Sequence, residues 1–143
     1  MESDGSGLRY RLRRALRQIG EQHHQLRVLH SRLRRAIASE DRRDARDGFR
    51  HYCEAVGAHF ALEDGVFFPA LHGLHPEHAE ELERLLRDHE GLRDTLGRLG
   101  RLLDLETIAP FGEGFESLRG SFATHERREE DLVSRLAAAS FED

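Results

Sequence analysis

The stretch HFALEDGVFFPAL, residues 59–71, sets the pattern that the rest of the chain repeats. It places a histidine, His59, four residues before a carboxylate, Glu63, in a largely apolar segment. Residues four apart in an α-helix lie one turn apart on the same face. We therefore expect His59 and Glu63 to point together into the interior of a helical protein, where they can bind one metal ion.

The same spacing recurs near the end of the chain, at His125 and Glu129 in HERREEDL. Two other segments with helical periodicity each carry a histidine among their apolar positions, at His23 and at His89. Four predicted helices thus offer ligands of the same kind.

Apolar residues recur on alternating steps of four and three, the pattern of helices that bury one stripe in a bundle. It predicts helices over about residues 8–38, 42–68, 77–104 and 112–139. We expect Asp41 or Asp44 to cap the second helix and Pro69 to end it. We also expect Val66 to continue its buried stripe after Glu63.

Four such stripes joined by short connections predict an all-α, up-down-up-down antiparallel four-helix bundle. The 143 residues suit a single domain, residues 1–143, rather than two. Helices joined by a short loop pair residues that lie equally far from it. With the third loop centred near Glu106, this places the four histidines in one layer.

The composition narrows the classes of function. The net charge of -5 is mild and the arginines are interleaved with acidic residues, so we expect no nucleic-acid partner. A single cysteine excludes a disulfide framework and a cysteine-rich metal module, and suits a reducing compartment. No apolar run approaches a membrane span and the N-terminus lacks signal-peptide features. We expect a cytoplasmic protein with no membrane partner.

A single histidine in a buried stripe is usually a hydrogen-bonded core residue. Four imidazoles and two carboxylates buried together and unpaired would cost several kcal/mol per group, a cost that metal ions reverse. Nitrogen and oxygen ligands without a thiolate favour iron over manganese or zinc. Two carboxylates on opposing helices favour a bridged pair of metal ions.

The segments HFALE with FFPAL, DHEGL and HERRE, together with His23 and Leu26, resemble the hemerythrin-like, or HHE cation-binding, family over nearly the whole chain. The family pattern of histidine and HxxxE segments matches six residues, namely His23, His59, Glu63, His89, His125 and Glu129. The resemblance implies a non-heme site with two iron ions, bridged by oxo or hydroxo, in a four-helix bundle. It also implies dioxygen, peroxide, nitric oxide or iron as ligands and substrates.

The sequence departs from the oxygen-carrying hemerythrins at one ligand. Those proteins pair the histidine of the third helix with another at a four-residue spacing, whereas here Leu85 and Arg93 flank His89. Fewer ligands disfavour reversible oxygen carriage and favour turnover of peroxide or nitric oxide.

Several polar residues lie near the predicted ligands. His30 and Tyr52 should face each other about 10 Å along the bundle axis from the site. They form either a hydrogen-bonded core pair or a functional pair, with Tyr52 as a ligand or a redox and proton relay and His30 as a further ligand. His24 would replace His23 as the ligand if the helix phase were shifted by one residue. Solvated or ligand-orienting roles are expected for three carboxylates, Asp64, Glu126 and Glu130.

Three functions remain open on the sequence. The first is a peroxidase- or catalase-like di-iron oxidoreductase that acts on peroxide, nitric oxide or dioxygen. The second is a module that binds or senses oxygen or iron without turnover. The third is a bundle with structural zinc. For each we expect a small-molecule partner and a monomer or weak homodimer.

Overall fold

The computed structural model describes the backbone of residues 6–104 and 108–141 and the side chains of residues 7–104 and 108–136. The loop centre expected near Glu106 lies outside these residues. The helical segments are α1 Ser6–Ala38, α2 Arg42–Leu62, the π-helical η1 Glu63–Phe67, α3 Phe68–Leu74, the 3₁₀-helical η2 Pro76–His78, α4 Ala79–Leu102 and α5 Ala109–Phe141.

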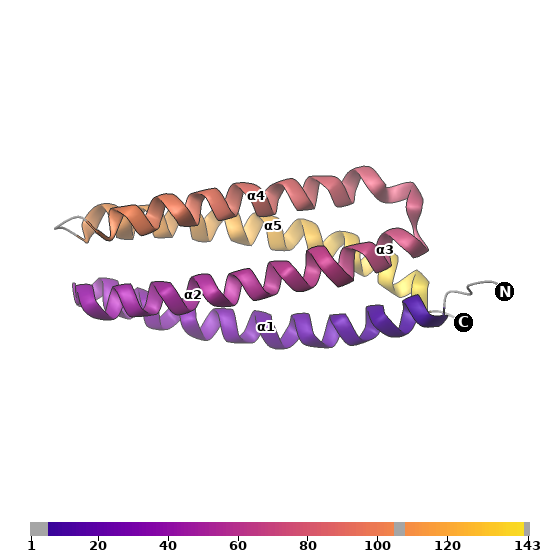
Figure 1. The fold of residues 1–143 in the computed structure, drawn as a ribbon, viewed down its shortest axis with the longest axis horizontal. Helices are drawn as coiled ribbons and strands as arrows, with labels where there is room; N and C mark the ends of the chain where they lie inside the picture. Colours follow the sequence, from indigo (N-terminus) through magenta and orange to yellow (C-terminus); the bar gives the residue numbers. More distant parts are fainter. Residues whose placement is uncertain (1–5, 105–107, 142–143) are drawn as a thin grey trace.

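The segments form four antiparallel rods, because α2, η1 and α3 follow one another along a single line (Figure 1). In this view α1 and α2 form the lower pair and α4 and α5 the upper pair, and both chain ends lie at the same end of the bundle. The predicted all-α, up-down-up-down bundle is confirmed.

A short turn fixes the register between α1 and α2. The amides of Glu40 and Asp41 donate to the carbonyls of Ile37 and Ala36, both over 3.0 Å, and Glu40 has a left-handed φ of 54°. This pairing ends α1 as a Schellman motif does. The side chain of Asp41 then accepts a hydrogen bond from the amide of Asp44 and caps α2. The tight turn holds the two helices side by side.

The second rod does not end at Pro69. The helix continues through the proline to Leu74, six residues beyond the predicted end at residue 68. Proline clashes with the carbonyl four residues before it and cannot donate to that carbonyl. The preceding residues are π-helical, and the amide of Phe68 donates to the carbonyl of Glu63, five residues back. This wider turn lets the rod pass the proline.

The π-helical turn also shifts the buried stripe by one residue. Val66, predicted to be buried, is 40% exposed, whereas Phe67 is 1% exposed. A π-turn contains about one residue more than an α-turn, so the residue that returns to the interior after Glu63 is the fourth and not the third. The expectation for Val66 was therefore wrong.

The apolar interior consists of two clusters along the bundle axis. One cluster is centred on phenylalanines, among them Phe49, Phe60 and Phe115, and the other includes Leu12, Phe67 and Leu132. The buried polar residues His59, Glu63, His89, His125 and Glu129 belong to neither cluster. All of them except His59 lie at chain positions between the two, so both ends of the polar layer are covered by apolar side chains.

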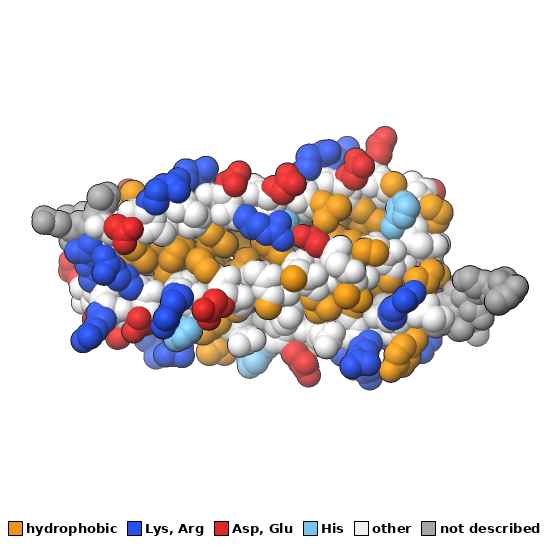
Figure 2. Space-filling model, viewed as in Figure 1, with side chains coloured by type: hydrophobic (Ala, Val, Ile, Leu, Met, Phe, Trp, Pro, Cys, Tyr) orange, Lys and Arg blue, Asp and Glu red, His pale blue; other side chains and the backbone are white. Residues whose placement is uncertain are grey.

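The surface is strongly charged. Arginine and acidic side chains alternate over the outer faces of the helices, and hydrophobic side chains show mainly along the line between the two helix pairs (Figure 2). Within the described residues, no helix has the length and apolar character required to cross a membrane.

Candidate metal centre

The structure brings all six predicted ligands into one layer of the bundle. They come from every rod: His23 from α1, His59 and Glu63 from α2 and η1, His89 from α4, and His125 and Glu129 from α5. Five are buried, and Glu63 and His89 are each 0% exposed.

These residues form two ligand groups that share both glutamates. The α1–α2 group contains His23, His59, Glu63 and Glu129, and the α4–α5 group contains Glu63, His89, His125 and Glu129. In each group the ligand atoms lie within 4.8 Å of one another. The shared glutamates make the arrangement suitable for two neighbouring cations with bridging carboxylates.

Glu63 faces both groups at once. Its Oε2 lies 3.4 Å from Nε2 of His59, and its Oε1 lies 3.1 Å from Nε2 of His89. Each oxygen is thus directed at one histidine of a different group. Neither oxygen has a hydrogen-bonding partner among the described residues, nor does Oε2 of Glu129. Buried carboxylate oxygens without partners are costly, and coordinated cations satisfy them.

The histidines converge in pairs through their Nε2 atoms. These atoms lie 3.2 Å apart in His23 and His59 and 3.0 Å apart in His89 and His125. Two nitrogens bound to one ion at a right angle, with bonds of about 2.1 Å, stand about 3.0 Å apart. The paired histidines therefore fit a metal ion in each group.

Hydrogen bonds on the far side of the ring orient His89. Its Nδ1 lies 2.7 Å from Oδ1 of Asp64, and Arg93 donates to the other oxygen of Asp64 over 2.9 Å. A ring N–H that donates to a carboxylate fixes the tautomer, so that Nε2 presents its lone pair. Arg93, four residues after His89, thus orients a ligand through Asp64.

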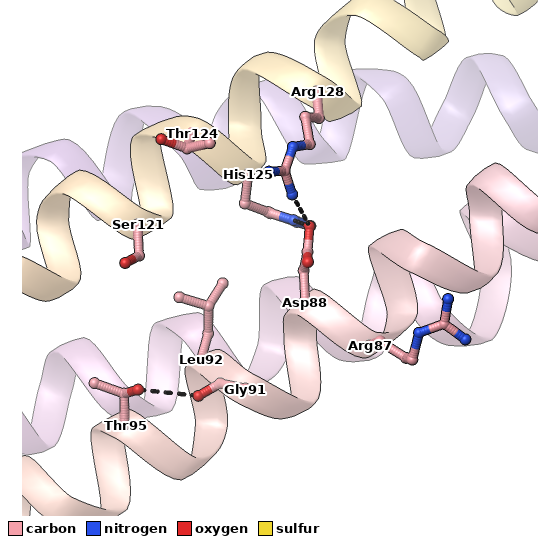
Figure 3. Close-up of a pocket in the computed structure, with 9 residues that line it drawn as sticks. All are labelled: Arg87, Asp88, Gly91, Leu92, Thr95, Ser121, Thr124, His125 and Arg128. Carbon is pink, nitrogen blue, oxygen red and sulfur yellow. Dashed lines mark hydrogen bonds and ion pairs between the residues drawn. The ribbon is translucent and has the colours of Figure 1, made fainter.

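His125 has the same kind of support. Its Nδ1 lies 2.9 Å from Oδ2 of Asp88, and Nη1 of Arg128 lies 3.3 Å from the same oxygen (Figure 3). Asp88 reaches across from α4 to α5. Both histidines of the α4–α5 group are therefore backed by a carboxylate that is itself paired with an arginine.

A neutral group supports His59 instead. Nδ1 of His59 lies 2.9 Å from the amide oxygen Oε1 of Gln22 on α1. An amide oxygen accepts the ring N–H but brings no negative charge. The two ligand groups consequently share the same ligand types but differ in the groups behind the imidazoles.

Phenylalanine rings enclose the centre. The ring of Phe60 stacks on His89 with centroids 3.9 Å apart and planes 11° apart, and Phe68 stacks on His89 at 5.6 Å. Phe122 packs against Phe60 at 5.9 Å. These rings hold the imidazole plane in place and exclude water from the α4–α5 group.

Without a cation, the pKa values of the two glutamates shift in opposite directions. Burial raises the pKa of Glu63, and the negative charge of the neighbouring Glu129 raises it further. Burial also acts to raise the pKa of Glu129, but the nearby imidazoles of His125 and His59 outweigh it, and the pKa is lowered. A protonated Glu63 beside an ionised Glu129 is the state expected of two close buried carboxyls.

Two of the histidines, His59 and His89, are held in the neutral form that binds metals. Burial and the neighbouring His23 lower the pKa of His59 to about 4. Burial also lowers the pKa of His89, against the opposing effect of Asp64. For His125 burial acts downward, but the negative charge of Glu129 and the hydrogen bond to Asp88 leave its pKa raised.

The alternative ligand His24 is exposed and belongs to neither group, so the structure places His23 and not His24 at the centre. His30 also lies outside both groups. Tyr52 is 4% exposed, and its ring centroid is 6.2 Å from that of His30. Nε2 of His30 has no hydrogen-bonding partner among the described residues.

The three neighbouring carboxylates differ in position. Asp64 orients a ligand, as anticipated. Glu126 approaches Nε2 of His23 to 3.5 Å at the edge of the layer, and Glu130 is exposed on α5. The sequence analysis missed Gln22 and Asp88. Both directly precede a ligand in the sequence and support the histidine of the next helix, a rule that could have revealed them.

Two cavities reach the centre along the side where α1 meets α5. One, of about 270 Å³, and another, of about 220 Å³, are both lined by His23, whose side chain is 13% exposed. A third cavity, of about 450 Å³, lies between α4 and α5 (Figure 3). There Asp88 and Arg128 stand between solvent and the ligand face of His125. Access is therefore expected at His23.

Comparison with protein families supports a cation-binding site. The family model described as "Hemerythrin HHE cation binding domain" matches residues 14–137, which include all six candidate ligands. Searches of curated proteins and of solved structures found no match.

Proposed function

Because the chain belongs to the hemerythrin HHE cation-binding domain family, we propose that its histidine and glutamate cluster holds two iron ions and acts on peroxide, nitric oxide or dioxygen. The observation that carries this proposal is the sharing of Glu63 and Glu129 by both ligand groups. A single-ion site needs no second pair of histidines on the other side of the same carboxylates.

In this proposal the α1–α2 group binds one ion and the α4–α5 group binds the other. The shared glutamates bridge the two, and the donor set of imidazoles and carboxylates suits iron. When bound, the two ions supply open coordination positions and exchangeable electrons for a small oxidant.

The residues of the chain have three tasks around that chemistry. Asp64 and Asp88 keep their histidines in the metal-binding tautomer. Phe60 and Phe68 exclude water from the closed side, and the cavities at His23 admit a small ligand from the other. The side through which a small ligand enters and the side that is closed to water therefore lie on opposite sides of the layer of candidate ligands.

Tyr52 is the residue of the chain that we propose to take part in the reaction. Burial raises the pKa of its phenol, so the hydroxyl keeps its proton at neutral pH. It lines the same cavity as His23. A phenol in that position can donate a proton or an electron to a ligand entering the cavity, without binding the metals itself.

A second candidate is a module that binds or senses oxygen or iron without turnover. The burial of Glu63 and His89 favours it, because a closed site with narrow access suits small ligands that need no further reaction partner. A third candidate, a structural zinc bundle, accounts less well for carboxylates shared between two groups.

The first test is the metal content of the isolated protein, measured by mass spectrometry together with its optical spectrum. Two irons per chain support the proposal, and one zinc or no metal contradicts it. Mixing with peroxide then separates the two iron functions. Catalytic loss of peroxide or evolution of oxygen supports an enzyme, and a stoichiometric colour change alone supports a binding module.

A further inference from the structure

The cavity of about 270 Å³ is larger than the proposed small oxidants require. It lies between α1, α2 and α5, with His23 at one end. A water molecule in the liquid takes up about 30 Å³, so the volume corresponds to roughly nine waters. A molecule of two or four atoms would leave most of this space to solvent.

One residue that lines the cavity, His30, has a buried polar atom without a partner among the described residues. Nε2 of His30 is buried and has no hydrogen-bonding partner among the described residues, although the ring is fixed by stacking on Phe115 at 4.9 Å. Such an atom destabilises the fold unless a ligand or a water molecule satisfies it. Burial, followed by the charges of Arg119 and Arg34, lowers the pKa of His30. A neutral ring can carry its proton on this nitrogen and donate it to a ligand that reaches it.

Three arginines and one carboxylate, Glu126, line the rest of the cavity. The arginines are Arg27, Arg34 and Arg119. Glu116 lies 3.1 Å from Nε of Arg34 and 3.7 Å from Nη1 of Arg119, so one carboxylate is shared between two guanidinium groups. The sharing leaves about one positive charge over on Arg34 and Arg119, while the formal charges of Arg27 and Glu126 offset each other. This balance suits a singly charged anion with planar oxygens.

The wall between these polar groups is apolar. Leu26, Phe122 and Ala123 line it, and Phe122 is part of the apolar cluster beside the metal centre. An inorganic anion would gain no binding energy from this wall, because it has no apolar surface to bury against it. A carboxylate with a flat apolar body would bury that body against it.

We propose that this cavity is a binding site for a small aromatic or aliphatic monocarboxylate. The carboxylate lies at Arg34 and Arg119, the apolar body lies against Leu26 and Phe122, and Nε2 of His30 makes the inner polar contact. Because His23 closes one end, the bound molecule blocks one approach to the α1–α2 group. This blocking rests on the proposed function, whereas the binding itself does not.

Equilibrium dialysis of the full-length protein as isolated, with benzoate as the probe, tests the proposal. We expect one benzoate per chain and binding of benzamide, a neutral analogue of the same shape, that is weaker by about tenfold or more. Arg119→Gln should reduce the affinity for benzoate about tenfold and leave that for benzamide unchanged. Arg98→Gln, on the exposed face of α4, is the matched control and should change neither.

A steric variant keeps the test independent of charge. Ala123→Leu places extra volume in the cavity and should abolish binding of both probes, with helicity by circular dichroism unchanged. The proposal is overturned if benzoate and benzamide bind equally well. It is also overturned if neither Arg119→Gln nor Ala123→Leu changes the affinity for benzoate. Binding of inorganic phosphate without binding of benzoate overturns it as well.

Metal analysis of the same samples separates this inference from the proposed function. Protein with two irons that fails to bind benzoate contradicts the carboxylate site alone. Protein that binds benzoate through Arg119 but contains no iron contradicts the di-iron function and leaves the carboxylate site standing.

Discussion

The carboxylate of Asp64 lies 2.7 Å from Nδ1 of His89, on a different helix, although Asp64 directly follows the proposed bridging ligand Glu63 in the sequence. Two consecutive residues thus serve the same centre. Glu63 is a candidate ligand of the cations, and Asp64 supports another candidate ligand, His89, from behind its ring. The same arrangement occurs in α1 and α4, where Gln22 and Asp88 directly precede a candidate ligand and each supports a histidine of the next helix.

The first prediction concerns this supporting contact. Asp64→Asn and Asp88→Asn each replace a carboxylate behind a histidine of the α4–α5 group by a neutral amide. We expect metal affinity to fall about 10- to 100-fold in each variant, because the imidazole becomes a weaker and less ordered ligand. Competition with a chromophoric chelator measures the affinity. Asp94→Asn, exposed on α4, is the control, and an equal loss in all three variants would contradict the assignment.

A second prediction distinguishes two adjacent histidines. His23→Ala should lower the metal content to one ion per chain or less, because it removes one of two imidazoles from the α1–α2 group. His24→Ala should leave the content unchanged, because His24 is exposed. Mass spectrometry of both variants after the same expression provides the comparison. Loss of metal from the His24 variant alone would mean that α1 is rotated relative to the structure.

The third prediction concerns the register change at Pro69. Phe67→Ala should destabilise the protein by about 3–5 kcal/mol, because Phe67 is 1% exposed in the apolar core. Val66→Ala should cost less than about 1 kcal/mol, because Val66 is 40% exposed. Urea denaturation of both variants gives the two values. If Val66→Ala cost more stability than Phe67→Ala, the segment would instead follow the regular α-helical pattern predicted from the sequence, with Val66 in the buried stripe.

This register change shows where sequence analysis reached its limit. Periodicity identified the four helices and the six clustered residues, because a helix whose buried stripe carries histidines must place them inside. It treated Pro69 as an end, since the local rule against proline within a helix is strong. Whether the chain bends, stops or forms a π-turn depends on burial of Phe67, Phe68 and Leu71 against other helices, which no local pattern records.

The supporting residues were only partly predictable for the same reason. Asp64 was recognised as a residue that could orient a ligand, because it adjoins one. Gln22 and Asp88 adjoin ligands in the same way, before the ligand in the sequence rather than after it, and they too meet a histidine of another helix. Only the packing of neighbouring helices decides which polar residue beside a buried stripe meets an imidazole and which meets water.

The fourth prediction concerns the reaction itself. Tyr52→Phe should keep the metal content of the wild-type protein, because Tyr52 lies outside the histidine and glutamate groups and the ring that packs on Phe115 at 5.4 Å is retained. The rate of peroxide loss should fall at least about tenfold if the phenol supplies a proton or electron. Stopped-flow absorbance measures the rate. An unchanged rate with full metal content would remove Tyr52 from the mechanism.

The fifth prediction is the pH dependence of stability in the metal-free protein. The folded pKa of Glu63 is raised above its usual value of 4.5, so the stability that its protonated form contributes is fully present below about pH 4.5 and is lost as pH rises. His59 is opposite in sign. Its folded pKa of about 4 lies below the usual 6.5, so its contribution is lost as pH falls from 6.5 toward 4.

Between about pH 4.5 and 6.5 the contributions of Glu63 and His59 to stability change in opposite directions. Above pH 6.5 the contribution of His59 no longer changes. The contribution of Glu63 continues to fall there, and so does that of His125, whose pKa is also raised. We expect the metal-free protein to lose stability from pH 6.5 to 8 by about 1.4 kcal/mol per pH unit for each proton involved. Urea denaturation in the presence of a chelator, at pH 6, 7 and 8, measures this slope.

Glu63→Gln tests the origin of the slope, because glutamine has the shape of the protonated glutamic acid and does not ionise. The variant should be more stable than the wild-type protein at pH 8 when both are metal-free, with a flatter pH dependence, and yet it should not hold two metal ions. Glu130→Gln, an exposed neighbour of Glu129, should follow the wild-type curve. If both variants follow that curve, Glu63 is already ionised in the metal-free fold.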